Sequence, residues 1–198
     1  MLSAQAVVKL HHRLTVLWHA EPEAPPAAAD DFLLAVARQH RANFALWHIE
    51  DEARAPGASD TEIASVKRRI DFTNQLRNDL AEQLDRTLLD SLAPRALPNP
   101  SASLHSESPG LIIDRLSILA LKLFHTREEA ERPGAPPGHS QRNQDRFAIL
   151  LEQRDDLAAC LDDLWQQTLA GQRRFKLYRQ LKMYNDPALN PVIYRASP

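Results

Sequence analysis

The sequence predicts an all-α fold, a helical bundle of about five to six helices with an irregular C-terminal tail. Leucine and alanine dominate the composition, while valine occurs only six times in 198 residues, which favours helices over strands. Apolar residues recur at helical spacing through four long segments of the chain. All fourteen prolines lie in connecting segments, at a helix start or in the tail, where a missing N–H does no harm.

The composition is that of an ordinary globular protein, with 43% hydrophobic and 25% charged residues. A chain of this length is long enough for one sizeable core, so we expect residues 1–198 to form a single all-helical domain. The net charge is −2, and acidic and basic residues are interspersed. The absence of a broad basic face argues against duplex nucleic acid as a partner.

The cellular location of the protein is predicted from the length of its apolar segments and from its cysteine content. No run approaches the ~18 apolar residues that a membrane span requires. Lys9, His11, His12 and Arg13 interrupt the N-terminal stretch, so we expect no secretory leader. The single cysteine, Cys160, excludes an internal disulfide and fits a reducing compartment. We therefore expect a cytoplasmic protein, with Cys160 as an inert core thiol because its helix is apolar-periodic.

The first three helices are delimited by proline and by capping residues. The first is predicted at about 3–20 and the second at about 30–54, where Pro56-Gly57 ends it. The third is predicted over about 62–92, with Asp60 able to cap it. The first helix has its own apolar stripe, so it is expected to pack on the bundle or on a second subunit, through Val7, Leu10, Leu14 and Leu17.

Ser108-Pro109 opens the fourth helix, because serine favours the N-cap and proline the first helical position. Pro133-Gly134 ends it. The fifth helix is predicted over about 140–170, with Gly171 as its stop. A sixth is predicted over about 173–185, ahead of the irregular tail. The sequence contains no convincing strand and no internal repeat.

Polar residues follow one arc of the third helix, at Lys67, Asp71, Asn74 and Asn78, and Arg77 lies within its apolar stripe. Asparagine weakens a helix interior, and a core-facing arginine needs a partner or a ligand. This pattern predicts a polar site inside the bundle. The alternative is a solvated boundary in which Lys67 pairs with Asp71 and Arg77 reaches water.

The fourth helix is apolar on every side, which predicts a central, buried position. Asp114 in this helix must therefore be paired, hydrogen-bonded or protonated. One interpretation is an internal ion pair of Asp114 with Arg77 or Arg154, the latter in the apolar stripe of the fifth helix. The other is a ligand site that also includes Arg115 and His125.

The second helix contributes Asn43, Trp47, His48 and Asp51 at helical spacing. His48 and Asp51 are three residues apart and can touch, as acid/base pairs do, so either is the candidate general base if catalysis occurs. The alternative is a core tryptophan with a polar rim.

A metal site built from His48, Asp51, Asp71, Asp114 and His125 is chemically reasonable, and it would correspond to a metal-dependent phosphohydrolase. No dense ligand motif such as H-E-x-x-H is present, so the sequence does not favour a metal, and the cofactor stays unassigned.

The segment near the C-terminus is dense in cationic and hydrogen-bonding groups, at Tyr178, Arg179, Lys182 and Asn185. These residues are expected to form a lid over an anionic ligand or, alternatively, an ordinary amphipathic helix.

Together these patterns predict a pocket for an anionic small molecule such as a sugar phosphate, nucleotide or nucleotide sugar. Positive charge would come from Arg77, Arg154 and Lys182. Hydrogen bonds would come from Asn43, Asn74 and Asn78. Phosphoester or glycosyl chemistry is the class to test, and the sequence leaves catalysis itself open.

The chain resembles a known family in five segments, 43–54 (NFALWHIEDEAR), 67–79 (KRRIDFTNQLRND), 106–125 (SESPGLIIDRLSILALKLFH), 153–161 (QRDDLAACL) and 178–190 (YRQLKMYNDPALN). This family is the bacterial domain of unknown function 4254. The resemblance implies a single helical domain of bacterial origin and carries no catalytic residue with it. Such proteins are often encoded beside glycosyltransferases of surface-polysaccharide pathways. A second hypothesis is therefore a non-enzymatic accessory subunit, a homodimer or a partner of a glycosyltransferase. Its contact would be made by the outer face of the first helix, with Trp18, or by the C-terminal tail.

Overall fold

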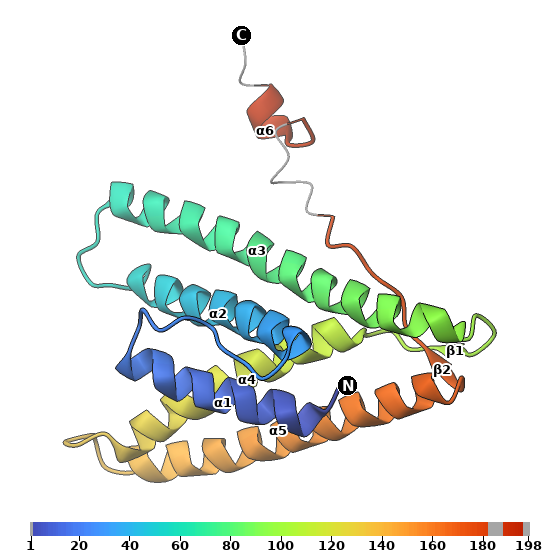
Figure 1. Cartoon of the computed structure of the whole chain (residues 1–198). Helices are drawn as coiled ribbons and strands as arrows, with labels where there is room; N and C mark the ends of the chain where they lie inside the picture. The colour runs from blue at the N-terminus through green and yellow to red at the C-terminus, as the bar shows by residue number, and fades with distance from the viewer. Residues whose placement is uncertain (1, 182–187, 196–198) are drawn as a thin grey trace.

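The computed structural model describes residues 2–181 and 188–195 (Figure 1). Its long helices are α1 (Ala4–Ala20), α2 (Asp31–Glu52), α3 (Asp60–Leu92), α4 (Pro109–Glu131) and α5 (His139–Leu169). Its short elements are the 3₁₀ turn η1 (Ala93–Arg95), the strands β1 (Ser103–Leu104) and β2 (Arg173–Arg174), and α6 (Pro191–Tyr194). The predicted all-α fold is confirmed, and the long helices begin and end within about two residues of the predicted positions.

The helices α2 and α3 begin where local side chains satisfy free backbone N–H groups. Asp30 accepts the N–H of Leu33 at 2.8 Å at the start of α2. Ser59 and Glu62 form a reciprocal capping box at the start of α3. The prediction of Asp60 as the cap of α3 is wrong by one residue, because Ser59 is the N-cap and Asp60 is the first residue of the helix. Both starts nonetheless depend on side chains within three positions of the helix.

The start of α4 depends on another helix. Ser108 precedes Pro109 as predicted, but its hydroxyl donates to the carboxylate of Asp85 on α3 and makes no cap of its own. Asp85 also accepts the N–H of Gly110 at 2.7 Å. A buried carboxylate of α3 therefore caps α4 and fixes where the two helices cross.

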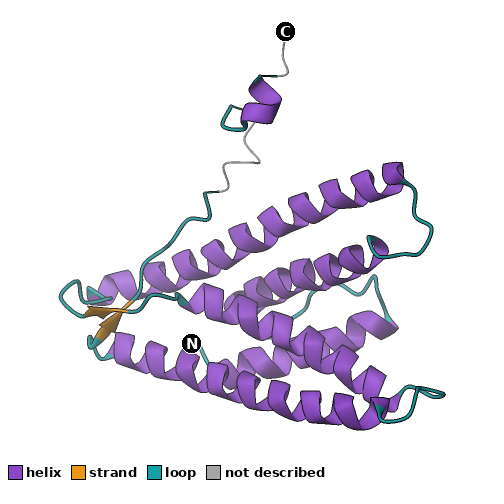
Figure 2. Cartoon of the chain, turned by 180° about the vertical axis from the view of Figure 1, so that it is seen from behind, coloured by secondary structure: helices purple, strands orange, loops and turns teal. Residues whose placement is uncertain are grey.

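Helix α4 lies at the centre of the bundle and contacts each of the other four long helices, as its apolar surface predicts (Figure 1). The helices α2 and α3 form one antiparallel pair, and α4 and α5 form another, as the view from behind also shows (Figure 2). The centre of α4 is almost fully buried at Ile112, Ile113, Leu116 and Leu121.

Helix α1 packs on this bundle, against α2, α4 and α5. Leu14 and Trp18 are fully buried. The Trp18 ring stacks over His40 with centroids 5.3 Å apart, and its indole N–H donates to the Ala24 carbonyl at 3.0 Å. The hypothesis that Trp18 lies on a face that contacts another protein is therefore wrong, because the bundle already covers it.

The predicted sixth helix over 173–185 is wrong for residues 173–181, and residues 182–187 lie outside the described part of the chain. Arg173 and Arg174 instead pair in parallel with Ser103 and Leu104. Phe175, only 2% exposed, anchors the extended chain in the core. Strand pairing and burial of one aromatic ring thus outweigh the helical periodicity of this segment.

The prediction of a core thiol is also wrong, because Cys160 is exposed. The buried stripe of α5 passes through Leu157, Leu161 and Leu164, and Cys160 lies beside it. Among the described residues, no helix combines the length and apolar character needed to cross a bilayer.

Asp85 is expected to make stability depend on pH. Burial raises its pKa to about 6, against the opposing effect of hydrogen bonds from Ser108 and Gly110. Because the folded-state pKa lies above the ordinary value of 3.8, its contribution is complete below pH ~4 and is lost as pH rises through 6. Asp85→Asn removes the charge, while its amide oxygen can accept from Gly110 and its NH2 group can donate to the Ser108 hydroxyl. Urea unfolding from pH 4 to 7 should show the wild type losing up to about 3 kcal/mol relative to this variant. Parallel stability curves would contradict the assignment.

Candidate functional site

A buried polar network joins α2, α3 and α4 around Asp114. Its carboxylate accepts hydrogen bonds from Gln39 at 2.6 Å, from Asn43 at 2.9 Å and from Arg77 at 2.9 and 3.2 Å. Arg77 also donates through Nε to the Asn74 side-chain oxygen at 3.1 Å. The interpretation of Asp114 as an internal ion pair is confirmed, with Arg77 as its partner.

The network continues through α4 to α1. Asn43 donates its second amide hydrogen to Ser117 at 2.9 Å, and Ser117 contacts Nδ1 of His40 at 2.7 Å. Nε2 of His40 lies 2.9 Å from the hydroxyl of Thr15, which itself donates to the His11 carbonyl. Nε2 of His40 must therefore carry the proton, and Nδ1 accepts from Ser117. Burial lowers the pKa of His40 to about 3, which keeps this ring neutral.

Five of the predicted site residues meet at one surface groove, which we call the α2–α3 groove. They are Asn43, Trp47, Asp51, Asn74 and Arg77. The rest of its lining is Leu46, Glu50, Arg54, Ile118 and Leu121. Its volume of about 510 Å³ lies in the range of small-molecule sites. The predicted convergence of polar groups from separate helices thus occurs for these five residues.

The cations of this groove already have partners. Arg54, in the turn after α2, pairs with Glu50 at 3.2 Å and with Asp51 at 3.7 Å. Arg77 pairs with Asp114, and both side chains are largely buried. The groove therefore offers directed hydrogen bonds and an apolar floor, without the excess positive charge that the sequence suggested.

The outer end of the polar arc on α3 does not enter the groove. Lys67 pairs with Asp71 as an i,i+4 ion pair, with side chains 63% and 38% exposed. This is the solvated boundary that was the alternative interpretation of these two residues. Asn78, one turn after Asn74, is half-buried and lies outside the groove lining.

Two predicted arginines lie elsewhere. Arg154 pairs with the adjacent Asp155 at 2.7 Å and lines a different pocket, between α1, α4 and α5. The expectation that Arg154 and Arg77 share one site is therefore wrong, because Arg154 finds its anion on α5 itself. Arg115 pairs with Glu107 at 2.8 Å beside a third hollow, between α4 and α5.

The predicted lid is not formed by the described residues near the C-terminus. Tyr178 and Arg179 are exposed and follow the extended segment after β2. Lys182 and Asn185 lie outside the described residues, so their predicted roles stay predictions.

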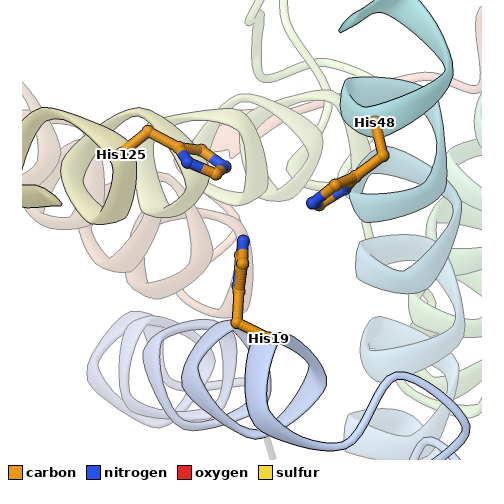
Figure 3. A group of neighbouring side chains, drawn as sticks. All are labelled: His19, His48 and His125. Atoms are coloured by element: carbon orange, nitrogen blue, oxygen red, sulfur yellow. The ribbon is translucent and has the colours of Figure 1, made fainter. Parts of the chain in front are cut away.

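The side chains of His48 and Asp51, the candidate acid/base pair on α2, point in different directions. Asp51 points outward beside Arg54, with its side chain 64% exposed. His48 donates from Nδ1 to the Phe44 carbonyl at 2.8 Å and faces α1 and α4 (Figure 3). The expected contact between His48 and Asp51 is wrong, because their side chains leave the helix toward different neighbours.

His48 instead meets two other imidazoles. His19 of α1, His48 of α2 and His125 of α4 point toward one another (Figure 3), and their candidate ligand atoms all lie within 4.8 Å of each other. We call these residues the three-histidine cluster. The sequence singled out His48 and His125 but missed His19. No spacing rule connects positions on three separate helices, so only the folded arrangement reveals the set.

Aromatic rings surround the three-histidine cluster. His19 stacks on Phe124 with centroids 3.9 Å apart, and His125 stacks on Trp47 at 4.8 Å and 7°. Burial lowers the pKa of His19, and the nearby His125 and His48 add to this effect against the opposing hydrogen bond to the backbone. Trp47 also lines the α2–α3 groove, so one side chain links the two features.

No curated protein and no solved structure matches the chain. One family model does match, over residues 33–177, and it is described as a protein of unknown function, DUF4254. This range takes in nearly all of α2, all of α3 to α5 and both strands, and so the whole groove and two of the three histidines. The family resemblance is thereby confirmed, with four of its five segments inside the matched range and the fifth, 178–190, beyond it. The chain belongs to the DUF4254 family of proteins of unknown function.

Proposed function

We propose that the α2–α3 groove binds a sugar-containing small molecule. The observation that carries this proposal is the pairing of an apolar floor with a polar rim in one groove. Trp47, Leu46 and Ile118 offer aromatic and aliphatic surface, while amides, carboxylates and guanidinium groups line the edges. A sugar ring needs this combination, because its C–H faces are apolar and its hydroxyls both donate and accept hydrogen bonds.

The charge balance favours a sugar ring over a free anion. A phosphate placed beside Arg77 would have to compete with Asp114, which already holds that guanidinium at 2.9 Å. A hydroxyl needs no such exchange, since it can accept from an arginine N–H and donate to a carboxylate such as Asp51. Sugar phosphates and nucleotide sugars remain candidates through their sugar rings.

The rim is held in place before any ligand binds. Asn43 is fixed by Asp114 and Ser117, and Asn74 is fixed by Arg77. Groups that are already ordered lose little conformational entropy on binding, which favours selective recognition by a small number of hydrogen bonds.

The groove supports binding more directly than catalysis. Asp51 lies in its lining and stays the candidate general base, whereas His48 lies outside it. The phosphohydrolase hypothesis built on carboxylates loses support, because Asp51, Asp71 and Asp114 each pair with a basic residue.

A matched pair of asparagine variants tests the proposal. Wild-type protein would be titrated with hexoses, hexose phosphates and uridine-diphosphate hexoses, with binding followed by ligand-observed NMR and calorimetry. For the compound that binds, Asn74→Ala should weaken affinity about tenfold, the value of one hydrogen bond to a fixed amide. Asn78→Ala, one turn further along α3 and outside the lining, should leave affinity unchanged.

The proposal fails if none of these compounds binds, or if both asparagine variants weaken binding equally. Circular dichroism of each variant would separate lost binding from lost fold.

A further inference from the structure

The three-histidine cluster has its ring tautomers set by hydrogen bonds. His19 and His48 each donate from Nδ1 to the backbone carbonyl four residues earlier, at 2.7 and 2.8 Å. His125 directs Nδ1 to the Glu128 carboxylate at 2.8 Å. A carbonyl or carboxylate oxygen can only accept, so the proton of each neutral ring lies on Nδ1. Each Nε2 therefore keeps a free lone pair.

Two of these lone pairs are buried without a partner among the described residues. The Nε2 atoms of His19 and His125 are buried and have no hydrogen-bond partner among the residues that the structure describes. A buried polar nitrogen left without a partner costs about 1–3 kcal/mol. Because these two nitrogen atoms face the same gap between the rings, they indicate a ligand that can accept an electron pair from each of them.

The distances are close to those of a metal site. Three atoms within 4.8 Å of one another have a common point about 2.8 Å or less from each. A zinc–imidazole bond is about 2.0–2.1 Å long, so each ring would need to move inward by less than about 1 Å. Rotation about side-chain bonds supplies such a shift without moving the helices.

We propose that His19, His48 and His125 bind one divalent transition-metal ion through their Nε2 atoms, with zinc as the best-fitting ion. Neutral imidazoles suit zinc, cobalt, nickel and copper, whereas magnesium and calcium prefer oxygen ligands. The hydrogen bonds on Nδ1 are the outer contacts that orient ligating histidines and make them more basic. Glu128 adds a negative charge behind His125, which offsets part of the charge of the ion.

The ligand set would leave one coordination position open. Within the described part of the chain, the group contains three residues and no further cysteine, aspartate or glutamate. Zinc sites with three protein ligands typically keep a fourth position for water or substrate, and there the ion makes bound water more acidic. The site therefore has the composition of a reactive centre rather than a closed structural one.

Trp47 connects this centre to the α2–α3 groove, because it stacks on His125 and also lines the groove. The metal site nonetheless stands independently of sugar binding, since its ligands come from other side chains. Either proposal can fail without the other.

Metal titration of untagged, chelator-treated protein tests the assignment. Zinc chloride followed by calorimetry should give one equivalent bound, and cobalt chloride should give the strong visible absorption of a four-coordinate ion. His19→Ala, His48→Ala and His125→Ala should each weaken zinc binding at least about 100-fold, and Glu128→Gln about tenfold. His12→Ala, an exposed histidine on α1, is the matched control and should bind zinc as the wild type does.

A measurement on the wild type covers the case in which a variant does not fold. The chain has eight histidines. Nitrogen NMR of their side chains should show zinc shifting the Nε2 signals of His19, His48 and His125 only. Absence of zinc binding, equal binding by the His19→Ala variant, or shifts confined to other histidines would each overturn the proposal.

Discussion

Replacing Asp114 by alanine is expected to lower the free energy of unfolding by about 4 kcal/mol. The substitution leaves the guanidinium of Arg77 without its carboxylate and frees the amide hydrogens of Gln39 and Asn43 in the interior. Removing one partner of a buried ion pair costs far more than the pair contributes, because the remaining charge stays desolvated. Guanidinium denaturation followed by circular dichroism measures the loss.

Asp71→Ala is the matched control for this prediction. Asp71 is also an aspartate paired with a basic residue, but its ion pair with Lys67 is exposed to solvent. Its removal should cost at most about 0.5 kcal/mol. If the two alanine variants were equally stable, Asp114 would not be the centre of a buried network. Combining Arg77→Met with Asp114→Leu should recover part of the lost stability, since neither charge then remains unpaired.

Gly110→Ala is expected to destabilise the protein by about 3 kcal/mol. A Cβ at this position would lie 2.3 Å from the carbonyl oxygen of Ala81 and 2.9 Å from the carboxyl of Asp85. The first of these atoms is backbone, so it cannot turn aside, and α3 and α4 would have to separate at their crossing. Chemical denaturation at a pH near 7 measures this effect.

The sign of the Gly110→Ala effect makes it informative. Gly110 is the second residue of α4, and without a close neighbour alanine would be neutral or stabilising there, because it is the better helix former. A gain in stability would therefore show that α3 and α4 are not in backbone contact at Gly110. A loss would show that close approach of the two helices determines the residue at this position.

The fold could be predicted from the sequence because its signals are local. Ser59 and Glu62 begin α3 through contacts within three residues. Proline at the first position marks the start of α4, although the Ser108 hydroxyl there bonds to Asp85 of another helix. The apolar surface of α4 predicts its central position, since a helix apolar on all sides must be covered on all sides. The prediction of a helix after Gly171 was wrong because the conformation of this segment is not determined by local signals. Its conformation depends on strand partners some seventy residues earlier in the chain.

The candidate site was predictable only in part. The pairing of Arg77 with Asp114 was foreseen as one alternative, because two opposite charges on core-facing arcs must find partners. Arg154 was misplaced because Asp155, its neighbour in sequence, satisfies it locally. His19 and His40 gave no signal in the sequence. Each depends on which helices lie beside it, and the periodicity of a single helix does not contain that information.

Helix α1 determines where the N-terminal boundary of a truncated fragment of this protein should be placed. The family match starts at residue 33, yet α1 ends well before it and still fills part of the interior with Leu14 and Trp18. A fragment trimmed to the matched boundaries would expose the surfaces of α2 and α4 that these side chains cover. It would also lack His19 of the three-histidine cluster. For this chain, the unit that should be expressed and compared is one helix longer than the family profile.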